Sequence, residues 1–444
     1  MTEDERDAHP VPVGRIARIA RLGGMAAGIA GRAAIGGAGM LAQGRRPSAR
    51  DLLLTPANAA RLTRQLSQMR GAAMKLGQLM SMEAGDLLPP DLAQVMARLR
   101  DQASHMPPGQ LKQVLAAAYG ADFVHRFRRF QTRPVAAASI GQVHRATALD
   151  GRDLAIKLQY PGIAASIDSD LANVAALIRM SGLLPRGFDL APLIDEARGQ
   201  LRAEADYAQE ARAMSRFADL LAGDDGFAVP RPAADLCAPG VLAMDFMAGE
   251  PVETLAGAPQ ALRDRLAERL IALTLREIFA FGLLQSDPNF ANFRWNGANG
   301  RIVLLDFGAV REVPGALVGR LRALLGAGLA EGQGLGGGPD LAEAAGAAGY
   351  LDPAMSAADR DRLLDMMRLA FAPFRTAEPF DFAASNLPAQ LRDMTLVHAR
   401  DRDGVHLPPI DLIFVQRKVA GLFLLGARLR ARVALAPLVA PHAA

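Results

Sequence analysis

The sequence has almost no cysteine and no clustered histidine. Its 444 residues include one cysteine, Cys237, which excludes a disulfide framework or a cysteine-based zinc site within the chain and favours a reducing compartment. The seven histidines contain no H-x-x-x-H pair of the kind that holds a metal ion. Aromatic residues are also few, at 5%, but apolar residues make up 50% of the chain, enough for a large core and two or more domains.

Lysine is the second scarcity. Only four of the 50 basic residues are lysines: Lys75, Lys112, Lys157 and Lys418. The chain uses arginine almost wherever a generic positive charge would serve. A lysine is therefore expected where a compact ammonium is needed and a wide guanidinium does not serve. Lys75 and Lys157 fall in motifs described below, whereas no motif contains Lys112 or Lys418.

Acidic residues are absent from one long segment. The net charge of +4 does not indicate wholesale nucleic-acid binding. Residues 8–50, however, contain seven arginines and no Asp or Glu, which suits an anionic surface, either lipid headgroups or nucleic acid. Ile16, Ile19 and Leu22 recur at helical spacing beside arginines, as an interfacial helix requires. The Gly/Ala-rich stretch 23–44 has about the length of a membrane span but contains Arg32, so a flexible linker is the alternative.

Hydrophobic patterning divides the rest of the chain into helical and β-rich regions. Residues 52–130 read as helical, with one helix opening at Pro107-Pro108. From Thr132 the apolar runs shorten, and Asp150-Gly151 is a hairpin turn signal before a strand that ends at Lys157. Further expected elements are a helix over 189–221, strands near 227–229, 241–246 and 302–305, helices from Gln260 onward, and a closing helix or helix pair over 410–436. The expected fold class is α+β.

Small residues occupy a turn between two expected strands. Residues 136–143, AAASIGQV, fit small-x-small-x-x-Gly-x-Val, the form of a protein-kinase phosphate loop. Small residues let backbone N–H groups approach phosphate oxygens, and alanine makes the loop stiffer than glycine would. The candidate nucleotide-binding residues here are Ala136, Ala137, Ala138, Ser139, Gly141 and Val143.

Lys157 lies 14 residues beyond Val143, at the end of an expected strand, in the sequence Leu-Ala-Ile-Lys. This matches the V-A-I-K strand of protein kinases, whose lysine contacts the α- and β-phosphates of ATP. A buried lysine needs a carboxylate partner, and the helix over 189–221 offers Glu204, Asp206 and Glu210. Glu210 is the expected partner of Lys157, with the other two next in line. The alternative is that these carboxylates form a solvated helix face.

Two further elements follow in kinase order. Asp287 precedes Asn292 by five residues, the spacing between the catalytic aspartate and the metal-binding asparagine of kinases. After one apolar strand comes Asp306-Phe307-Gly308, the D-F-G element whose aspartate holds Mg²⁺. Asp287 is therefore a candidate catalytic residue together with Lys157 and Glu210, and Asn292 and Asp306 are the candidate metal ligands. Adenine is expected at the hinge around Met244 to Met247, where the strand ends at Phe246.

Two features of protein kinases are missing. Gln285-Ser286 replaces the His-Arg pair before the catalytic aspartate. No A-P-E follows the D-F-G, and residues 309–330 pass almost directly into a helix. The segment that normally holds a peptide substrate is thus absent or very short, which does not support a conventional docking site for protein substrates.

Together these motifs resemble the UbiB-type atypical kinase-like family, from about Val11 to about Val433. The resemblance includes the alanine-rich loop, a K-x-G-Q motif at residues 75–78, an E-x-D motif at residues 204–206 and the segment QSDPNFANF at residues 285–293. The V-P-x-x-R-x-x-R segment that begins at Val11 is most similar to the branch shared by α-proteobacteria and mitochondria.

The resemblance implies a two-lobed protein-kinase-like fold, with a small β-rich N-lobe, a helical C-lobe and an N-terminal helical extension. The implied division is a membrane-association segment over 1–50, the extension over 51–131, the N-lobe over 132–246 and the C-lobe over 247–444. It also implies a regulatory lid, in which Lys75 and Gln78 lie over the active site and face Glu204 and Asp206.

The resulting hypothesis is a membrane-associated, Mg²⁺-dependent ATPase that supports ubiquinone biosynthesis. Its expected ligands and partners are ATP and ADP, Mg²⁺, membrane lipids, ubiquinone precursors and other ubiquinone-biosynthesis proteins, without nucleic acid. The expected location is the cytoplasmic face of a bacterial inner membrane, with peripheral or N-terminal attachment. Two alternatives stay open, a true kinase acting on a protein or small molecule and a nucleotide-binding scaffold. The oligomeric state also stays open, a homodimer included.

Overall fold

The structure is a computed structural model that describes residues 71–72, 75–76, 106–138, 140–180, 190–287, 289–331, 340–400 and 408–443. The expected membrane segment over 1–50, Gln78 and Ser139 lie outside these residues. The chain forms two compact units. The first unit consists of Met1–Arg212 and Arg231–Phe246. The second unit consists of Ala213–Pro230 and Met247–Ala444.

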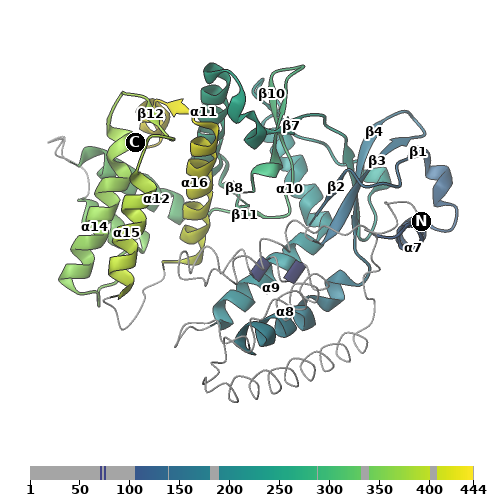
Figure 1. The fold of residues 1–444 in the computed structure, drawn as a ribbon, viewed down its shortest axis with the longest axis horizontal. Coiled ribbons are helices and arrows are strands. Elements are labelled where there is room, and N and C mark those ends of the chain that lie inside the picture. Colours follow the sequence, from purple (N-terminus) through teal and green to yellow (C-terminus); the bar gives the residue numbers. More distant parts are fainter. Residues whose placement is uncertain are drawn as a thin grey trace, which may run out of the picture. The chain divides into compact units, whose positions relative to one another are not determined.

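The first unit is built on an antiparallel sheet (Figure 1). Its strand order is β1-β3-β4-β6, and β2 pairs with β3. The bounds are β1 Phe127–Phe130, β2 Ala136–Ala137, β3 Gly141–Ala148, β4 Asp153–Gln159 and β6 Val241–Asp245. The expected turn at Asp150-Gly151 joins β3 to β4, and Gly151 adopts a φ of 94°, which favours glycine. Leu154, Ile156 and Leu158 of β4 are fully buried and pack in one cluster with the helix α7 (Pro108–Tyr119).

Strand β1 lies in the region that the sequence predicts to be helical. That prediction is right for α7, which begins at Pro108 as expected, and wrong after it, where a single turn of 3-10 helix (Phe123–Arg126) leads into β1. A register shift between Phe127 and Arg129 interrupts the pairing of β1 with β3. Burial along the strand therefore does not alternate, and the period of two that marks a strand in sequence is absent.

Three helices lie between β4 and β6 along the chain: α8 (Ile163–Met180), α9 (Ala191–Ala205) and α10 (Tyr207–Leu220). The sequence predicts one helix over 189–221, but Asp206 separates α9 from α10 with φ −90° and ψ 81°. Its carboxylate accepts a hydrogen bond from the backbone N–H of Gln209 at 2.8 Å. An aspartate that caps the following helix in this way competes with continuation of the preceding one.

In the second unit, helix α11 (Gln260–Arg276) runs into a π-helical turn, η6 (Glu277–Phe281). Strand β8 (Leu283–Gln285) follows and pairs with β11 (Val310–Glu312). A four-stranded sheet has the order β5-β10-β9-β7, with bounds β5 Phe227–Ala228, β7 Glu250–Pro251, β9 Phe293–Asn296 and β10 Arg301–Leu304. The two motifs singled out in the sequence therefore lie in the connections from β8 to β9 and from β10 to β11.

The rest of the second unit is mainly helical (Figure 1). Its helices are α12 Gly315–Ala330, α13 Leu341–Ala348, α14 Ala357–Phe371, α15 Leu387–Arg400, α16 Ile410–Leu429 and α17 Ala436–Val439, and the strands β12 Phe380–Asp381 and β13 Arg432–Val433 pair with each other. Short 3-10 turns are η4 Ala234–Leu236 in the first unit, and η5 Val252–Gly257, η7 Phe290–Asn292, η8 Ala372–Arg375 and η9 Ala440–His442 in the second. Among the described residues, no helix combines the length and the apolarity that crossing a membrane requires.

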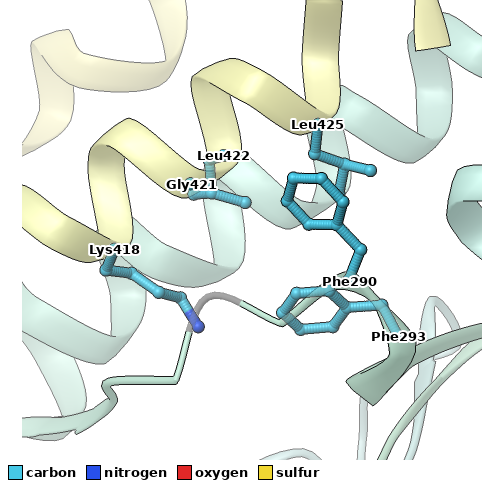
Figure 2. A pocket seen from close by; sticks show the side chains of 6 residues that line it. All are labelled: Phe290, Phe293, Lys418, Gly421, Leu422 and Leu425. Atoms are coloured by element: carbon cyan, nitrogen blue, oxygen red, sulfur yellow. The ribbon is translucent and has the colours of Figure 1, made fainter. Parts of the chain in front are cut away.

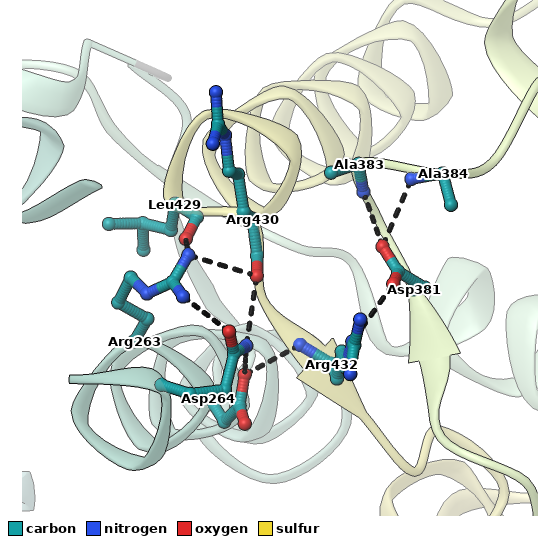
Figure 3. Close-up of polar contacts among 9 residues, drawn as sticks. Arg263, Asp264, Asp381, Ala383, Ala384, Leu429, Arg430 and Arg432 are labelled. Carbon is teal, nitrogen blue, oxygen red and sulfur yellow. Dashed lines mark hydrogen bonds and ion pairs between the residues drawn. The ribbon is translucent and has the colours of Figure 1, made fainter. Parts of the chain in front are cut away.

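The closing helix is shorter than the sequence predicts. Helix α16 ends at Leu429, and Arg430 turns the chain with a φ of 51° into β13. Polar contacts fix this turn to the start of α11, where Arg263 donates to the carbonyl of Leu429 at 2.7 Å and Asp264 accepts from the N–H of Arg432 (Figure 3). The side chain of Arg432 also contacts Asp381 of β12. The C-terminal strand pair is thereby fixed to α11 and α16.

Candidate nucleotide site

Lys157 and Glu210 form a buried ion pair in the first unit. Lys157 Nζ lies 2.7 Å and 2.9 Å from the two carboxylate oxygens of Glu210. Lys157 is 7% exposed and Glu210 is 1% exposed, so the charges have little access to water and depend on each other. The ring of Tyr207 lies 5.2 Å from the same ammonium. The structure thus contains the ion pair that the sequence predicts, formed between β4 and α10.

A second ion pair in the same unit joins Lys75 to Glu204. Lys75 is 5% exposed, which differs from the surface position that an isolated helical lysine usually takes. Asp206, which the resemblance places beside this pair, is exposed and caps α10 instead. The E-x-D motif is therefore divided between an ion pair to Lys75 and a helix cap.

The alanine-rich loop begins as β2 and closes on β3. Ala136 pairs with Val143, and the N–H of Ala138 donates to the carbonyl of Gly141 at 2.9 Å. A Cβ atom at Gly141 would lie only 2.2 Å from the carbonyl oxygen of Leu158 in β4. The glycine at position 141 therefore lets β3 approach β4 closely, a structural role separate from phosphate binding.

In the second unit, Asp287 and Asn292 contact each other. The amide of Asn292 donates to Asp287 Oδ2 at 3.2 Å, and the N–H of Asn289 donates to Asp287 Oδ1 at 3.2 Å. Asn292 is buried in the turn η7, whereas Asp287 is partly exposed. The loop thus presents a carboxylate and an amide oxygen within one short segment.

Asp306 has an unusual backbone conformation, with a φ of 62°. Its carboxylate accepts from the N–H of Gly308 at 3.1 Å, a local bond that helps aspartate to adopt the left-handed region. Phe307 is 1% exposed and its ring centre lies 5.2 Å from that of Phe217, which anchors the D-F-G element. The N–H of Leu305 donates to the carbonyl of Asn292 at 2.8 Å, so the D-F-G element is fixed to the loop of residues 286–292, named the catalytic loop after its candidate role.

These donors suit Mg²⁺. Magnesium prefers oxygen ligands, and it is commonly held by one or two carboxylates together with phosphate oxygens and water. Asp306, Asn292 and Asp287 supply such oxygens in the second unit. Among the residues that the structure describes, no group of three or more His, Cys, Asp or Glu side chains is placed to hold a metal ion.

The expected adenine residues stand where the chain passes from one unit to the other. Met244 is buried in β6 and pairs with Ala155, and Met247 begins the next stretch of the second unit.

Three residues that contact these loops are not among the candidates that the sequence predicts: Gln285, Glu277 and Lys418. Gln285 holds the position where kinases have histidine, and its side-chain amide donates to the carbonyls of Leu305 and Asp306. Lys418 of α16 is 2% exposed and donates to the carbonyl of Gln285 at 2.9 Å. The scarcity of lysine was a signal for Lys418, whereas nothing in the sequence distinguished Glu277.

The sequence is similar to known proteins over more than half of its length. Residues 98–332, more than half of the chain, match the ABC1 atypical kinase-like domain. The chain is 36% identical to the mitochondrial atypical kinase COQ8 of Saccharomyces cerevisiae, over 97% of this chain and 85% of that protein. It is 34% identical to the mitochondrial atypical kinase COQ8B of Rattus norvegicus, over 97% of this chain and 81% of the relative.

A solved structure is also similar over most of the chain. The structure of Rv3197 from Mycobacterium tuberculosis in complex with erythromycin matches with a TM-score of 0.61 and 28% identity, covering 86% of this chain and 95% of that one. These matches confirm the resemblance and the α+β, kinase-like fold class expected from the sequence. The chain belongs to the UbiB-type family of ABC1 atypical kinase-like proteins, and is an enzyme of the ATP-dependent phosphoryl-transfer class.

Proposed function

We propose that the protein is a membrane-associated, Mg²⁺-dependent ATPase of the atypical kinase type that supports ubiquinone biosynthesis. The observation that carries this proposal is the buried Lys157–Glu210 ion pair, found together with the Asp287, Asn292 and Asp306 donor set in kinase order. Both oxygens of one carboxylate hold the buried lysine in place. Its ammonium is therefore already positioned before an anionic ligand binds. The relatives named COQ8 support the link to ubiquinone.

Each residue has a proposed role. Lys157, oriented by Glu210, holds the α- and β-phosphates, and the backbone of residues 136–143 approaches phosphate oxygens. Asn292 and Asp306 would hold Mg²⁺, and the ion would supply positive charge beside the phosphate oxygens. Asp287 accepts a hydrogen bond from the attacking water and orients it. Catalysis in this scheme is mainly positioning and electrostatic stabilisation.

A transfer reaction to a protein is the main alternative. It is disfavoured because Gly315 already starts helix α12, soon after the D-F-G element ends at Gly308. The buried Lys75–Glu204 pair supports the proposal that this region acts as a lid in place of a peptide-binding segment. If a Lys75 variant transferred phosphoryl groups to a protein and the wild type did not, the lid would be shown to suppress kinase activity.

A non-catalytic scaffold is the second alternative. Retention of Asp287, Asn292 and Asp306, with Asn292 and Asp287 in contact, favours turnover over binding alone. The deciding measurement is the fate of γ-labelled phosphate. Purified protein is incubated with Mg²⁺-ATP, anionic liposomes and a membrane extract, beside Asp306→Asn.

The expected result is free labelled phosphate that increases with liposomes and is lost in Asp306→Asn. Label on a protein or small molecule in the wild type alone would establish the kinase alternative. Nucleotide binding without release or transfer of label would establish the scaffold.

The membrane proposal rests on the acid-free segment over residues 8–50, and the proposed location is the cytoplasmic face of the inner membrane. A chain that starts near Ser48 should no longer sediment with anionic vesicles, whereas the full chain should sediment and be released in part by salt. Complete sedimentation of the shortened chain would remove this segment as the anchor.

A further inference from the structure

Lys418 is the least expected of the four lysines because it lies in the core of the second unit. Its ammonium donates to the backbone carbonyl of Gln285 at 2.9 Å, and the side-chain oxygen of Gln285 lies 3.5 Å away. The ring centre of Phe293 lies 5.2 Å from the same nitrogen. Figure 2 shows the side chain reaching from α16 toward the catalytic loop, beside an apolar crevice lined by Phe290, Phe293, Gly421, Leu422 and Leu425. The ammonium of Lys418 therefore interacts with Gln285, where the catalytic loop begins, and has almost no contact with solvent.

Glu277 contacts Gln285 from another element. It belongs to the π-helical turn η6, is fully buried, and accepts a hydrogen bond from the backbone N–H of Gln285 at 3.2 Å. The same carboxylate oxygen lies 3.5 Å from Lys418 Nζ. Single π-helical turns are frequent at functional sites. Glu277 and Lys418 therefore hold both backbone groups of one residue, the N–H and the carbonyl of Gln285.

The side chain of Gln285, in turn, contacts the main chain at the D-F-G element. Its side-chain amide donates to the carbonyl of Leu305 at 2.8 Å and to the carbonyl of Asp306 at 2.7 Å. It also lies two residues before Asp287 along the chain. The buried side chain of Gln285 thus links the start of the catalytic loop to the main chain of Asp306, the candidate metal ligand.

We propose that Lys418 and Glu277 are positioning residues that hold Gln285, and that Gln285 sets the placement of the metal ligand Asp306 relative to Asp287. Neither Lys418 nor Glu277 contacts nucleotide or metal in this scheme, and both act through the main chain of Gln285. The proposal rests on the proposed Mg²⁺-ATP function and deepens it, because the pair would determine how strongly the metal couples to nucleotide. Residues that orient metal ligands typically change metal affinity about 10- to 100-fold when they are removed.

The geometry also explains why position 418 is lysine in a chain that prefers arginine. Lys418 meets a carbonyl oxygen, an amide oxygen and a carboxylate oxygen around one nitrogen. A compact ammonium with three rotatable donors matches such a set, whereas a planar guanidinium would place its donors in a wider fork.

The test measures the affinity of ADP for the full-length protein with Mg²⁺ and in EDTA. The ratio of the two affinities is the metal coupling. We expect Gln285→Leu and Lys418→Met to lower this coupling by about tenfold or more, with ADP affinity in EDTA changed less than about twofold. Lys112→Met is the matched control, since Lys112 is exposed on α7, and it should retain wild-type coupling.

A double variant separates positioning from stability. Lys418→Met alone leaves Glu277 buried beside an apolar side chain, which lowers stability whatever the role of the pair. In Lys418→Met/Glu277→Leu the unpaired charge is gone, so thermal stability should recover while the metal coupling stays low. Recovery of both quantities in the double variant would overturn the proposal, because a purely structural pair predicts that outcome.

Two further outcomes are distinguishable. If the wild type shows metal coupling and Gln285→Leu retains it, the positioning proposal fails while the proposed function stands. If the wild type shows no effect of Mg²⁺ on ADP binding and no release of phosphate, the proposed function fails and the positioning proposal falls with it.

Discussion

Three of the four lysines are buried in ion pairs, and each supports a different part of the molecule. Lys75 pairs with Glu204, Lys157 with Glu210 and Lys418 with Glu277, whereas Lys112 is exposed. A residue type that a chain rarely uses is informative where it persists, because the common alternative has been avoided there. Lys75 and Lys157 lie in motifs of the sequence, and the buried contacts of Lys418 give that third lysine the same explanation.

The Lys157–Glu210 pair should contribute differently to stability and to binding. Lys157→Met leaves a buried carboxylate without its partner, and a loss of about 3–5 kcal/mol in the free energy of unfolding is expected. Adding Glu210→Gln removes that charge, so stability should largely return, but affinity for Mg²⁺-ATP should not. Denaturant unfolding and nucleotide titration of the two variants check this. Binding at wild-type affinity in the double variant would exclude Lys157 from the phosphate site.

Gly141 gives a second prediction for a single residue. In Gly141→Ala the new Cβ would lie 2.2 Å from the carbonyl oxygen of Leu158, so β3 and β4 must separate. Overpacking of this kind costs about 1–3 kcal/mol. Gly109→Ala is the control, since nothing lies within 4 Å of a Cβ there. Thermal unfolding should show a clear loss for Gly141→Ala and none for Gly109→Ala, and equal behaviour would contradict the close approach.

At the scale of elements, the junction before β5 depends on Asp224. Burial alone would raise the pKa of this carboxyl, but hydrogen bonds from Arg276 and from the N–H of Gly226 lower it below its usual value. A lowered folded-state pKa stabilises the fold at pH values above the unfolded pKa, about 3.9 for aspartate, and that contribution is lost as the pH falls through the folded value.

Asp224→Asn should therefore be less stable than the wild type at pH 7, by roughly 1 kcal/mol. The difference should shrink as the pH falls below about 4. Urea unfolding across this pH range measures it, and a difference that does not change with pH would rule out ionisation of Asp224 as its source.

Elements also show what a sequence can and cannot predict. The β3–β4 hairpin, the start of α7 and the strand β10 follow from turn residues, proline and an apolar run, all of which act locally. Strand β1 did not follow, because its bulge removes the alternation, and the break at Asp206 did not, because capping competes with an otherwise helical pattern. In the site, the kinase motifs were readable because their spacing is local.

The contact between Lys418 and Gln285 could not be read in this way. These residues are 133 positions apart, and only the packing of α16 against the start of the catalytic loop brings them together. Glu277 likewise looks like any helical glutamate until the π-helical turn places it inside the core. Burial that results from tertiary packing cannot be predicted from the local sequence pattern.

At the scale of the whole molecule, the chain is divided between two units that each hold part of the proposed machinery. Lys157 and Glu210 belong to the first unit, and Asp287, Asn292 and Asp306 belong to the second. A ligand that binds only the folded protein stabilises it by mass action, about 2.7 kcal/mol at 100 times its Kd.

Mg²⁺-ADP should therefore raise the unfolding temperature of the wild type, and the rise should be lost in Asp306→Asn and in Lys157→Met/Glu210→Gln. The two variants alter separate units, so equal losses would show that both units contribute to one binding event. A rise that persists in either variant would assign nucleotide binding to the other unit alone. Scanning calorimetry with and without the ligand makes the measurement.

The placement of the lysines also has a practical consequence. Amine-specific reagents need an accessible, uncharged amine, and Lys75, Lys157 and Lys418 are each at most 7% exposed, whereas Lys112 is exposed on α7. Apart from the amino terminus of the chain, mild acylation of the native protein should therefore modify one position, which makes Lys112 a natural attachment point for a fluorophore or a solid support. The same reagent applied during unfolding would report, lysine by lysine, the order in which the two units open.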